Sequence, residues 1–219
     1  MNKQIIPNIF ALDDLTFKRK HKILSFSDIL HIDFMDGKFT KDKSLTLDKI
    51  SLCLQRKKKY HLHLMAYNPI QYVDVISKIN PKVVYIHIEA FLTNRSFERT
   101  IKVFQEKNIE VGVAINPNTD IREIFYYANK VKHFLIMSVV PGMEGQLFLD
   151  ETYERVQELK SRFPFSVVAV DGGVNANNIL NLSQNGADIM YIGSAISSKP
   201  NPLKEYENIV NQLEKTKTF

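Results

Sequence analysis

The sequence of 219 residues has one cysteine, Cys53, and so cannot form an internal disulfide. It has no hydrophobic stretch long enough to cross a bilayer. Near the N-terminus, acidic residues interrupt the apolar segment before a signal-peptide core could form, so we expect no secretory route. These absences predict a cytoplasmic protein without a membrane partner, in which Cys53 lies on the apolar face of a helix.

The sequence also lacks a concentrated basic region. Lys and Arg exceed Asp and Glu by five, 29 against 24, and the excess is spread over 17–22, 41–43 and 55–60. Proteins that bind nucleic acids usually show a denser basic stripe with aromatic residues between the charges. We therefore expect no nucleic-acid partner, although the mild positive charge would help to attract an anionic substrate.

No low-complexity segment, proline-rich linker or shift in composition divides the chain, so residues 1–219 are interpreted as one catalytic domain. Eight short apolar runs, typical of parallel strands covered on both faces, alternate with longer mixed segments. The runs are 4–10, 29–36, 59–65, 83–89, 110–116, 134–141, 165–173 and 187–194. Segments such as 96–108 and 150–163 have apolar residues at helical spacing. Eight strand–helix units predict an α/β protein with a single (β/α)8 TIM barrel, and a doubly wound sheet is the alternative.

Ionisable residues alternate within three of these apolar runs. Side chains two residues apart on a strand share a face, so each pair projects to one side. The pairs are His31 with Asp33, His61 with His63, and His87 with Glu89, and Asp171 ends the seventh run. Polar groups on a buried strand must be paired or bind something. Imidazole and carboxylate groups at strand ends suit a divalent transition metal such as zinc, iron or manganese.

Glycine-rich turns follow the last three runs, at 139–146, 171–174 and 192–196. Glycines there allow backbone N–H groups to approach an anion closely. The loops after strands seven and eight of such barrels often hold a phosphate. The second half of the chain is therefore predicted to bind a phosphate group.

Several motifs resemble those of the ribulose-phosphate 3-epimerase family, over almost the whole chain. "HIDFMDGKF" resembles the family block H-x-D-x-M-D-G-x-F, "HLHLM" resembles D-x-H-L-M, and "HIEA" resembles an H-x-E block. "MSVVPGMEGQLF" is similar to M-x-V-x-P-G-F-G-G-Q-x-F, and "VDGGV" and "GSAI" match directly. The resemblance implies a metal-dependent 3-epimerase that interconverts D-ribulose 5-phosphate and D-xylulose 5-phosphate in the pentose phosphate pathway.

The resemblance also implies roles for individual residues. His31, Asp33, His63 and Asp171 would hold one divalent ion (Zn, Fe, Mn or Co), and Asp33 and Asp171 would form the acid–base pair. The substrate and its phosphate would contact Asn8, Met35, Met65, Met137, Gly142, Gly145, Gly172, Gly173, Gly193 and Ser194. A homo-oligomer is expected on the same ground.

Five positions depart from the family pattern: Asn8, Lys38, His61, Met143 and Glu144. We expect His61 to face the same side as His63 without binding the ion. We expect Glu144 to point to solvent, because a carboxylate near a phosphate weakens binding. The departures leave two alternatives open: a 3-epimerase for a ketohexose 6-phosphate such as allulose 6-phosphate, and a non-catalytic barrel that binds sugar phosphates.

Overall fold

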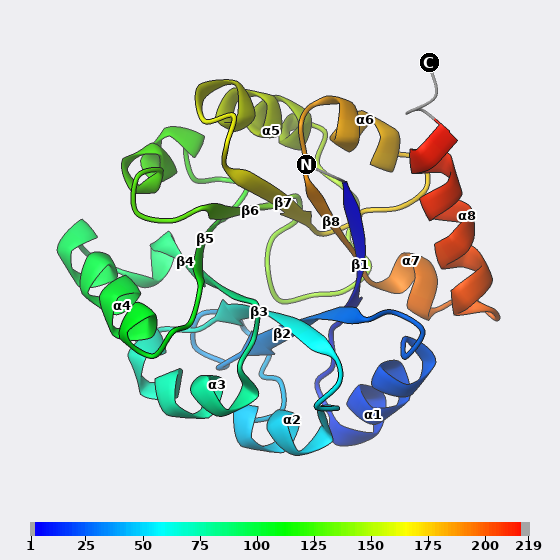
Figure 1. Ribbon diagram of the computed structural model, residues 1–219, viewed down its shortest axis with the longest axis horizontal. Helices are drawn as coiled ribbons and strands as arrows, with labels where there is room; N and C mark the ends of the chain where they lie inside the picture. Colours follow the sequence, from blue (N-terminus) through cyan, green and yellow to red (C-terminus); the bar gives the residue numbers. More distant parts are fainter. Residues whose placement is uncertain (1–2, 216–219) are drawn as a thin grey trace.

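Eight parallel strands close into a barrel at the centre of the molecule (Figure 1). The computed structural model describes residues 3–215. The strands are β1 (Gln4–Ile9), β2 (Ile29–Met35), β3 (Lys59–Met65), β4 (Val83–His87), β5 (Val111–Ile115), β6 (His133–Met137), β7 (Val167–Asp171) and β8 (Ile189–Ile192). The first strand pairs with both β2 and β8, which closes the sheet. This closure confirms the predicted (β/α)8 barrel and excludes an open doubly wound sheet.

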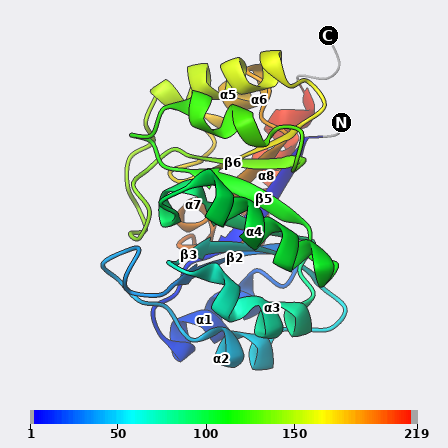
Figure 2. The same ribbon diagram turned by 90° about the vertical axis from the view of Figure 1, so that its left-hand side faces the viewer.

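Helices surround the barrel in both views (Figures 1 and 2). The α-helices are α1 (Asp14–Ile23), α2 (Leu47–Cys53), α3 (Val73–Ile79), α4 (Asn94–Glu106), α5 (Glu151–Arg162), α6 (Ile179–Gln184), α7 (Ser194–Ser197) and α8 (Pro202–Lys215). The 3-10 helices are η1 (Pro69–Tyr72), η2 (Ile88–Ala90) and η3 (Ile121–Tyr127), and η3 stands where an α-helix would follow β5. Side-chain oxygens of Asp13, Thr46 and Thr93 accept backbone N–H groups and so fix the start of α1, α2 and α4.

Alternate residues of most strands belong to two separate apolar clusters. The larger cluster fills the space between the sheet and the helices. The smaller cluster fills the barrel itself and includes Ile6, Tyr85, Leu135, Ala169 and Tyr191. Because the barrel interior is a packed core, a ligand can reach polar groups only at its ends.

Gly112 on β5 makes room for the Tyr85 ring inside the barrel. A Cβ atom at Gly112 would lie 2.5 Å from Cδ1 of Tyr85 and 3.0 Å from Cβ of His133. The Tyr85 side chain is completely buried, so it has little freedom to move away. The small residue on one strand therefore compensates for the large one on the neighbouring strand.

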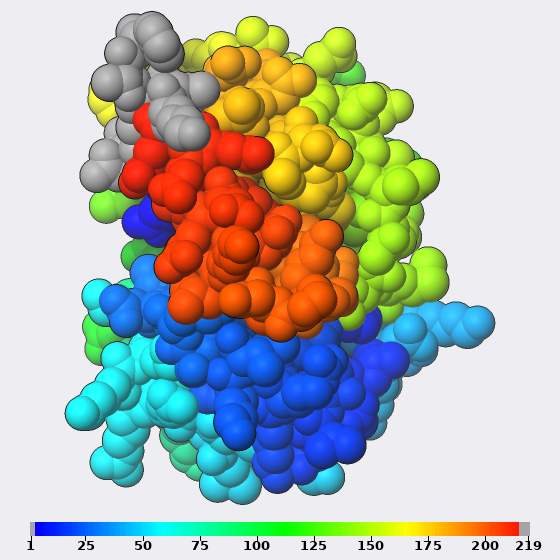
Figure 3. All heavy atoms as spheres, turned by 90° about the vertical axis from the view of Figure 1, so that its right-hand side faces the viewer, coloured from blue at the N-terminus to red at the C-terminus, as the bar shows by residue number. Residues whose placement is uncertain are grey.

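The first strand and the last helix lie side by side on one side of the barrel. In Figure 3 the orange and red segment, α7 and α8, lies against the blue N-terminal segment. The Tyr206 hydroxyl on α8 donates a hydrogen bond to the carbonyl oxygen of Ile5 on β1, at 3.1 Å. Within residues 3–215, no helix has both the length and the apolar character needed to cross a membrane.

The packing around Gly112 leads to a stability prediction. Gly112→Ala should lower the free energy of unfolding by about 1–3 kcal/mol, because the added methyl group overlaps the buried Tyr85 ring. Urea denaturation of the two proteins measures the difference. In a Tyr85→Ala background, which removes the ring atoms that would clash, the same substitution should be much less destabilising. An equal loss in both backgrounds would contradict this explanation.

Candidate metal and acid–base site

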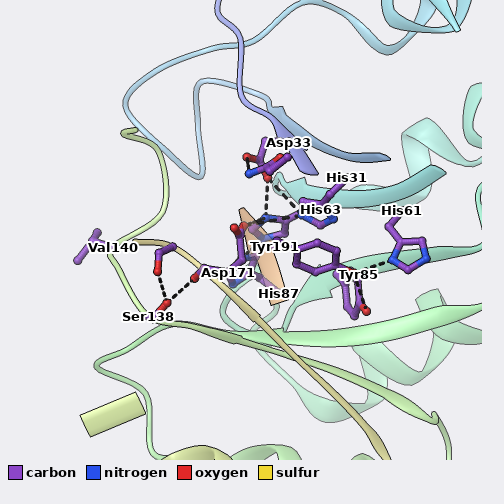
Figure 4. A network of polar contacts seen from close by, with 12 residues as sticks. His31, Asp33, His61, His63, Tyr85, His87, Ser138, Val140, Asp171 and Tyr191 are labelled. Atoms are coloured by element: carbon purple, nitrogen blue, oxygen red, sulfur yellow. Dashed lines mark hydrogen bonds and ion pairs between the residues drawn. The ribbon is translucent and has the colours of Figure 1, made fainter. Parts of the chain in front are cut away.

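Two imidazoles and two carboxylates meet inside the carboxyl end of the barrel (Figure 4). His31 and Asp33 come from β2, His63 from β3, and Asp171 from the last position of β7. One ligand atom from each residue lies within 4.8 Å of the others, and all four residues are buried. The structure thus brings together the four residues that the family resemblance proposed as metal ligands.

Nδ1 of His63 lies within hydrogen-bond distance of Oδ1 of Asp33, at 3.1 Å, whereas His31 lies farther from both carboxylates. Nε2 of His31 lies 3.6 Å from Oδ1 of Asp33 and 3.7 Å from Oδ2 of Asp171. These separations are too long for good hydrogen bonds. Neither ring nitrogen of His31 has a hydrogen-bond partner among the described residues. A buried imidazole without a partner is unfavourable. A divalent ion coordinated by two nitrogens and two oxygens would satisfy it, so the donor set fits a metal.

Electrostatics in this group favour the charged form of Asp33. Burial alone would raise the pKa of Asp33, but His31 and His63 outweigh burial and hold the pKa of that carboxyl well below its usual range. Burial opposes the charge on His63 as well, yet Asp171 and Asp33 raise the pKa of His63 to about 9. Burial lowers the pKa of His31 and the same two carboxylates raise it, and the net shift is upward. Without a metal, a proton on His63 therefore faces the negative charge of Asp33.

A chain of hydrogen bonds behind His63 determines which of its nitrogens faces the group. Nε2 of His63 lies 2.7 Å from Nε2 of His87, and Nδ1 of His87 lies 3.1 Å from Oε2 of Glu89. Burial lowers the pKa of His87 to about 4, although Glu89 opposes this shift, so the ring is neutral at pH 7. The tautomers that satisfy every atom have His87 donating to Glu89 and accepting from His63. The Nδ1 atom of His63 is then the one available to a metal.

His61 lies outside the four-residue group. Its Nδ1 atom is 2.7 Å from the hydroxyl of Tyr191, which donates in turn to the hydroxyl of Tyr85 at 3.1 Å. The Tyr191 ring stacks on His31 with centroids 3.6 Å apart, so it also supports that imidazole. Burial lowers the pKa of His61 to about 3. Sequence reasoning did not predict this role of Tyr191. The signal was a tyrosine at an inward position of the eighth apolar run.

A pocket of about 360 Å³ opens beside Asp33 and Asp171. It contains nearly all the positions proposed for substrate and phosphate: Asn8, Met65, Met137, Gly142, Gly145, Gly172, Gly173, Gly193 and Ser194. Met35 is the exception, because its completely buried side chain does not line this pocket. Residues that sequence reasoning did not propose, such as Phe10 and Lys199, also line the pocket.

Two of these glycines are required by close approach of neighbouring chain segments. Gly172 and Gly173 have φ angles of 111° and 60°. A Cβ atom at Gly172 would lie 2.4 Å from a Val139 methyl, and one at Gly173 would lie 2.8 Å from the backbone nitrogen of Phe148. The Ser138 hydroxyl donates to the carbonyl of Asp171 at 2.9 Å, which ties the loop after β6 to the end of β7 (Figure 4).

Asn8 and Glu144, two positions that depart from the family pattern, both contact charged side chains. The side-chain amide of Asn8 donates to Oδ2 of Asp33 at 2.8 Å and so orients that carboxylate. Glu144 does not point to solvent as expected. Its carboxylate lines the pocket and forms two hydrogen bonds, both 2.7 Å long, with Nζ of Lys20. The expectation was wrong because nothing in the sequence distinguishes Lys20 from the other cations of 17–22.

The chain is similar to known epimerases along most of its length. The sequence model of the Ribulose-phosphate 3 epimerase family matches residues 4–197. The ribulose-phosphate 3-epimerase of Helicobacter pylori strain J99 is 32% identical over 200 residues, covering 88% of this chain and 90% of that protein. The same enzyme of Aquifex aeolicus is 34% identical over 178 residues, with 78% of each chain covered.

Solved structures with the same architecture include more distant proteins. A 3-hexulose-6-phosphate synthase from Salmonella typhimurium superposes with a TM-score of 0.69 at 13% identity, covering 97% of this chain and 99% of that one. A mutant tryptophan synthase alpha-subunit from Pyrococcus furiosus gives 0.70 at 16% identity, with 98% and 100% covered. At these identities the likeness supports the fold alone.

The first prediction from this site concerns metal content. The purified protein should hold one divalent ion per chain, and His31→Asn should lose it, because the substitution removes one of four ligands. Removal of a ligand should weaken binding by more than the roughly 10–100-fold typical of changes to a ligand's supporting partners. Elemental analysis after dialysis measures this. His61→Asn, a matched change on the adjacent strand, should keep the ion. A protein without metal, or equal loss in both variants, would contradict the assignment.

The second prediction concerns protons. Metal ligands must be deprotonated, and the pKa of His63 is raised to about 9 in the metal-free protein, so His63 carries a proton at pH 7. Zinc binding at pH 7 should therefore release at least one proton. Zinc affinity should also rise by about tenfold per unit between pH 7 and pH 9, because protons compete less as pH increases. Calorimetric titration in two buffers of different protonation enthalpy counts the released protons. Zinc binding without proton release would refute this prediction.

Proposed function

The chain belongs to the ribulose-phosphate 3-epimerase family, and from this we propose that it interconverts D-ribulose 5-phosphate and D-xylulose 5-phosphate. One observation carries the proposal beyond family membership. Asp33 and Asp171 border the same pocket and also belong to the buried group that fits a metal. Inversion at a carbon beside a ketone needs both kinds of group, because one proton leaves and another arrives while negative charge develops on oxygen.

The two carboxylates are proposed to act as an acid–base pair. Asp33 enters the reaction ionised, since its neighbouring imidazoles lower the pKa of its carboxyl and Asn8 donates to it. It removes the proton at carbon 3, and a protonated Asp171 returns one on the other face. In the reverse direction the two residues exchange roles. A divalent ion held by His31, Asp33, His63 and Asp171 would act as a Lewis acid for the negative charge on the substrate oxygens.

The remainder of the pocket is proposed to bind the rest of the substrate. Met65 and Met137 give an apolar lining next to the carboxylates, which limits access of water to the reacting carbon. At the other end, backbone N–H groups near Gly145, Gly172, Gly173, Gly193 and Ser194 would hold the phosphate. Lys199 adds a positive charge to this lining.

The same proposal includes the setting in which the enzyme works. We propose that residues 1–219 form one catalytic domain, that the protein is cytoplasmic and that it assembles as a homo-oligomer. A rice relative, 30% identical over 205 residues, is named as a cytoplasmic isoform of ribulose-phosphate 3-epimerase. The spread of positive charge over separate segments supports the absence of a nucleic-acid partner.

The acid–base proposal predicts the effect of removing either carboxylate. Asp33→Asn and Asp171→Asn should each lower turnover by at least about 10²–10⁴-fold, because each loses a proton carrier and a charged ligand. Wild-type enzyme in heavy water should place deuterium at carbon 3 of the product. Metal content, measured in the same samples, separates loss of the ion from loss of proton transfer.

Asp188→Asn is the matched control. This buried carboxylate pairs with Lys160 and accepts from the Val168 backbone nitrogen, away from the pocket. Its removal should lower stability while the folded fraction keeps its turnover. More than a tenth of wild-type activity in either pocket variant would refute the mechanism. Assays with allulose 6-phosphate and D-ribulose 5-phosphate distinguish the ketohexose epimerase, and binding without turnover of either would indicate a non-catalytic barrel.

A further inference from the structure

Lys20 and Glu144 form an ion pair at the edge of the pocket, although 124 positions separate them in the chain. The ammonium of Lys20 donates to both carboxylate oxygens of Glu144, each at 2.7 Å, and to the carbonyl oxygen of Phe10 at 2.9 Å. The Lys20 side chain is only 5% exposed, whereas that of Glu144 is 30% exposed. A buried cation thus holds a carboxylate that is partly open to the pocket.

The fold explains why this lysine reaches the carboxyl end of the barrel. Side chains on an α-helix lean towards its N-terminus, and the N-terminus of α1 follows the carboxyl end of β1. Lys20 therefore extends along α1 towards Phe10, the residue directly after β1. Glu144 approaches from the loop between β6 and α5.

Glu144 lies at the end of the pocket proposed to hold the phosphate. Its Oε1 atom is 3.5 Å from the position that a Cβ atom would take on Gly193. Gly193 and Ser194 line the same pocket, together with Gly145 from the Glu144 loop. An unpaired carboxylate here would repel a phosphate dianion across a few ångströms, partly shielded from water.

We propose that Lys20 is a positioning residue that sets phosphate affinity at this end of the pocket, and that it acts by cancelling the charge of Glu144. The inference rests on the proposed function, because it takes the phosphate to lie over Gly193 and Ser194. Because the two opposite charges are paired, Lys20 and Glu144 together add no net charge to this end of the pocket. Backbone N–H groups and Lys199 then act on the phosphate without opposition from Glu144.

Three variants change the charge of the pair in steps. Lys20→Met leaves Glu144 unpaired, Glu144→Gln leaves Lys20 positive, and the double variant removes both charges. Inorganic phosphate, as a competitive inhibitor of D-ribulose 5-phosphate turnover at low ionic strength, is the probe. Its inhibition constant should be about tenfold higher in Lys20→Met, lower than wild type in Glu144→Gln, and close to wild type in the double variant.

This order separates charge cancellation from a structural tie between α1 and the loop. A structural tie would make both single variants bind phosphate more weakly, and the double variant would not recover. The double variant also controls for damage to folding, because it carries the same Lys20→Met change. Lys18→Met is a matched control on the same helix, since Lys18 is exposed and pairs with Asp14. It should leave the phosphate constant unchanged.

The outcomes distinguish this inference from the proposed function. Weaker phosphate binding in both single variants, or no change in any of the three, would overturn the role of Lys20 and leave the proposed epimerase reaction intact. Phosphate that does not compete with D-ribulose 5-phosphate in wild type would overturn both the phosphate end of the pocket and the inference. Loss of deuterium incorporation at carbon 3 in wild type would count against the reaction alone.

Discussion

The attraction between buried imidazoles and carboxylates is the interaction on which the rest of this structure depends. Two carboxylates in an apolar barrel would be strongly unfavourable unless cations faced them. A protonated His63 supplies such a cation in the metal-free protein, and a metal ion fits the same place. Since Asp171 arrives from β7 and Asp33 from β2, the group exists only when the barrel is closed. The candidate site therefore forms only together with the closed sheet, and both contribute to the same folded state.

Each member of this group is held by a partner that the barrel also supplies. Asn8 orients Asp33, and His87 forms a hydrogen bond with one nitrogen of His63. The Tyr191 ring stacks on His31. Such outer contacts set the direction and basicity of the groups that meet a metal or a substrate. Glu89 ends one of these chains by accepting from the backbone of Asn116. The site is consequently rigid before any ligand arrives, which suits proton transfer over short distances.

The two ends of the pocket differ in the groups that would interact with a substrate. Near Asp33 and Asp171, ionised side chains and an apolar lining favour chemistry on a carbon–hydrogen bond. Near Gly193, the proposed phosphate contacts come mainly from backbone N–H groups, and the side-chain charges of Lys20 and Glu144 are paired with each other. A family position changed from glycine to glutamate can be accommodated because a lysine on a distant helix lies within reach. Compensation of this kind allows a binding loop to vary while the acid–base residues stay the same.

The sequence by itself was sufficient for the fold, because eight apolar runs separated by helical segments leave few architectures possible. The alternation of His31 with Asp33 also predicted that both share a face, since side chains on a strand alternate with a period of two. Only the tertiary structure decided which charges meet across the barrel. The turn of Glu144 towards Lys20, the stacking of Tyr191 on His31 and the burial of Met35 away from the pocket are examples. Such contacts join residues far apart in the chain, so periodicity and local spacing contain no information about them.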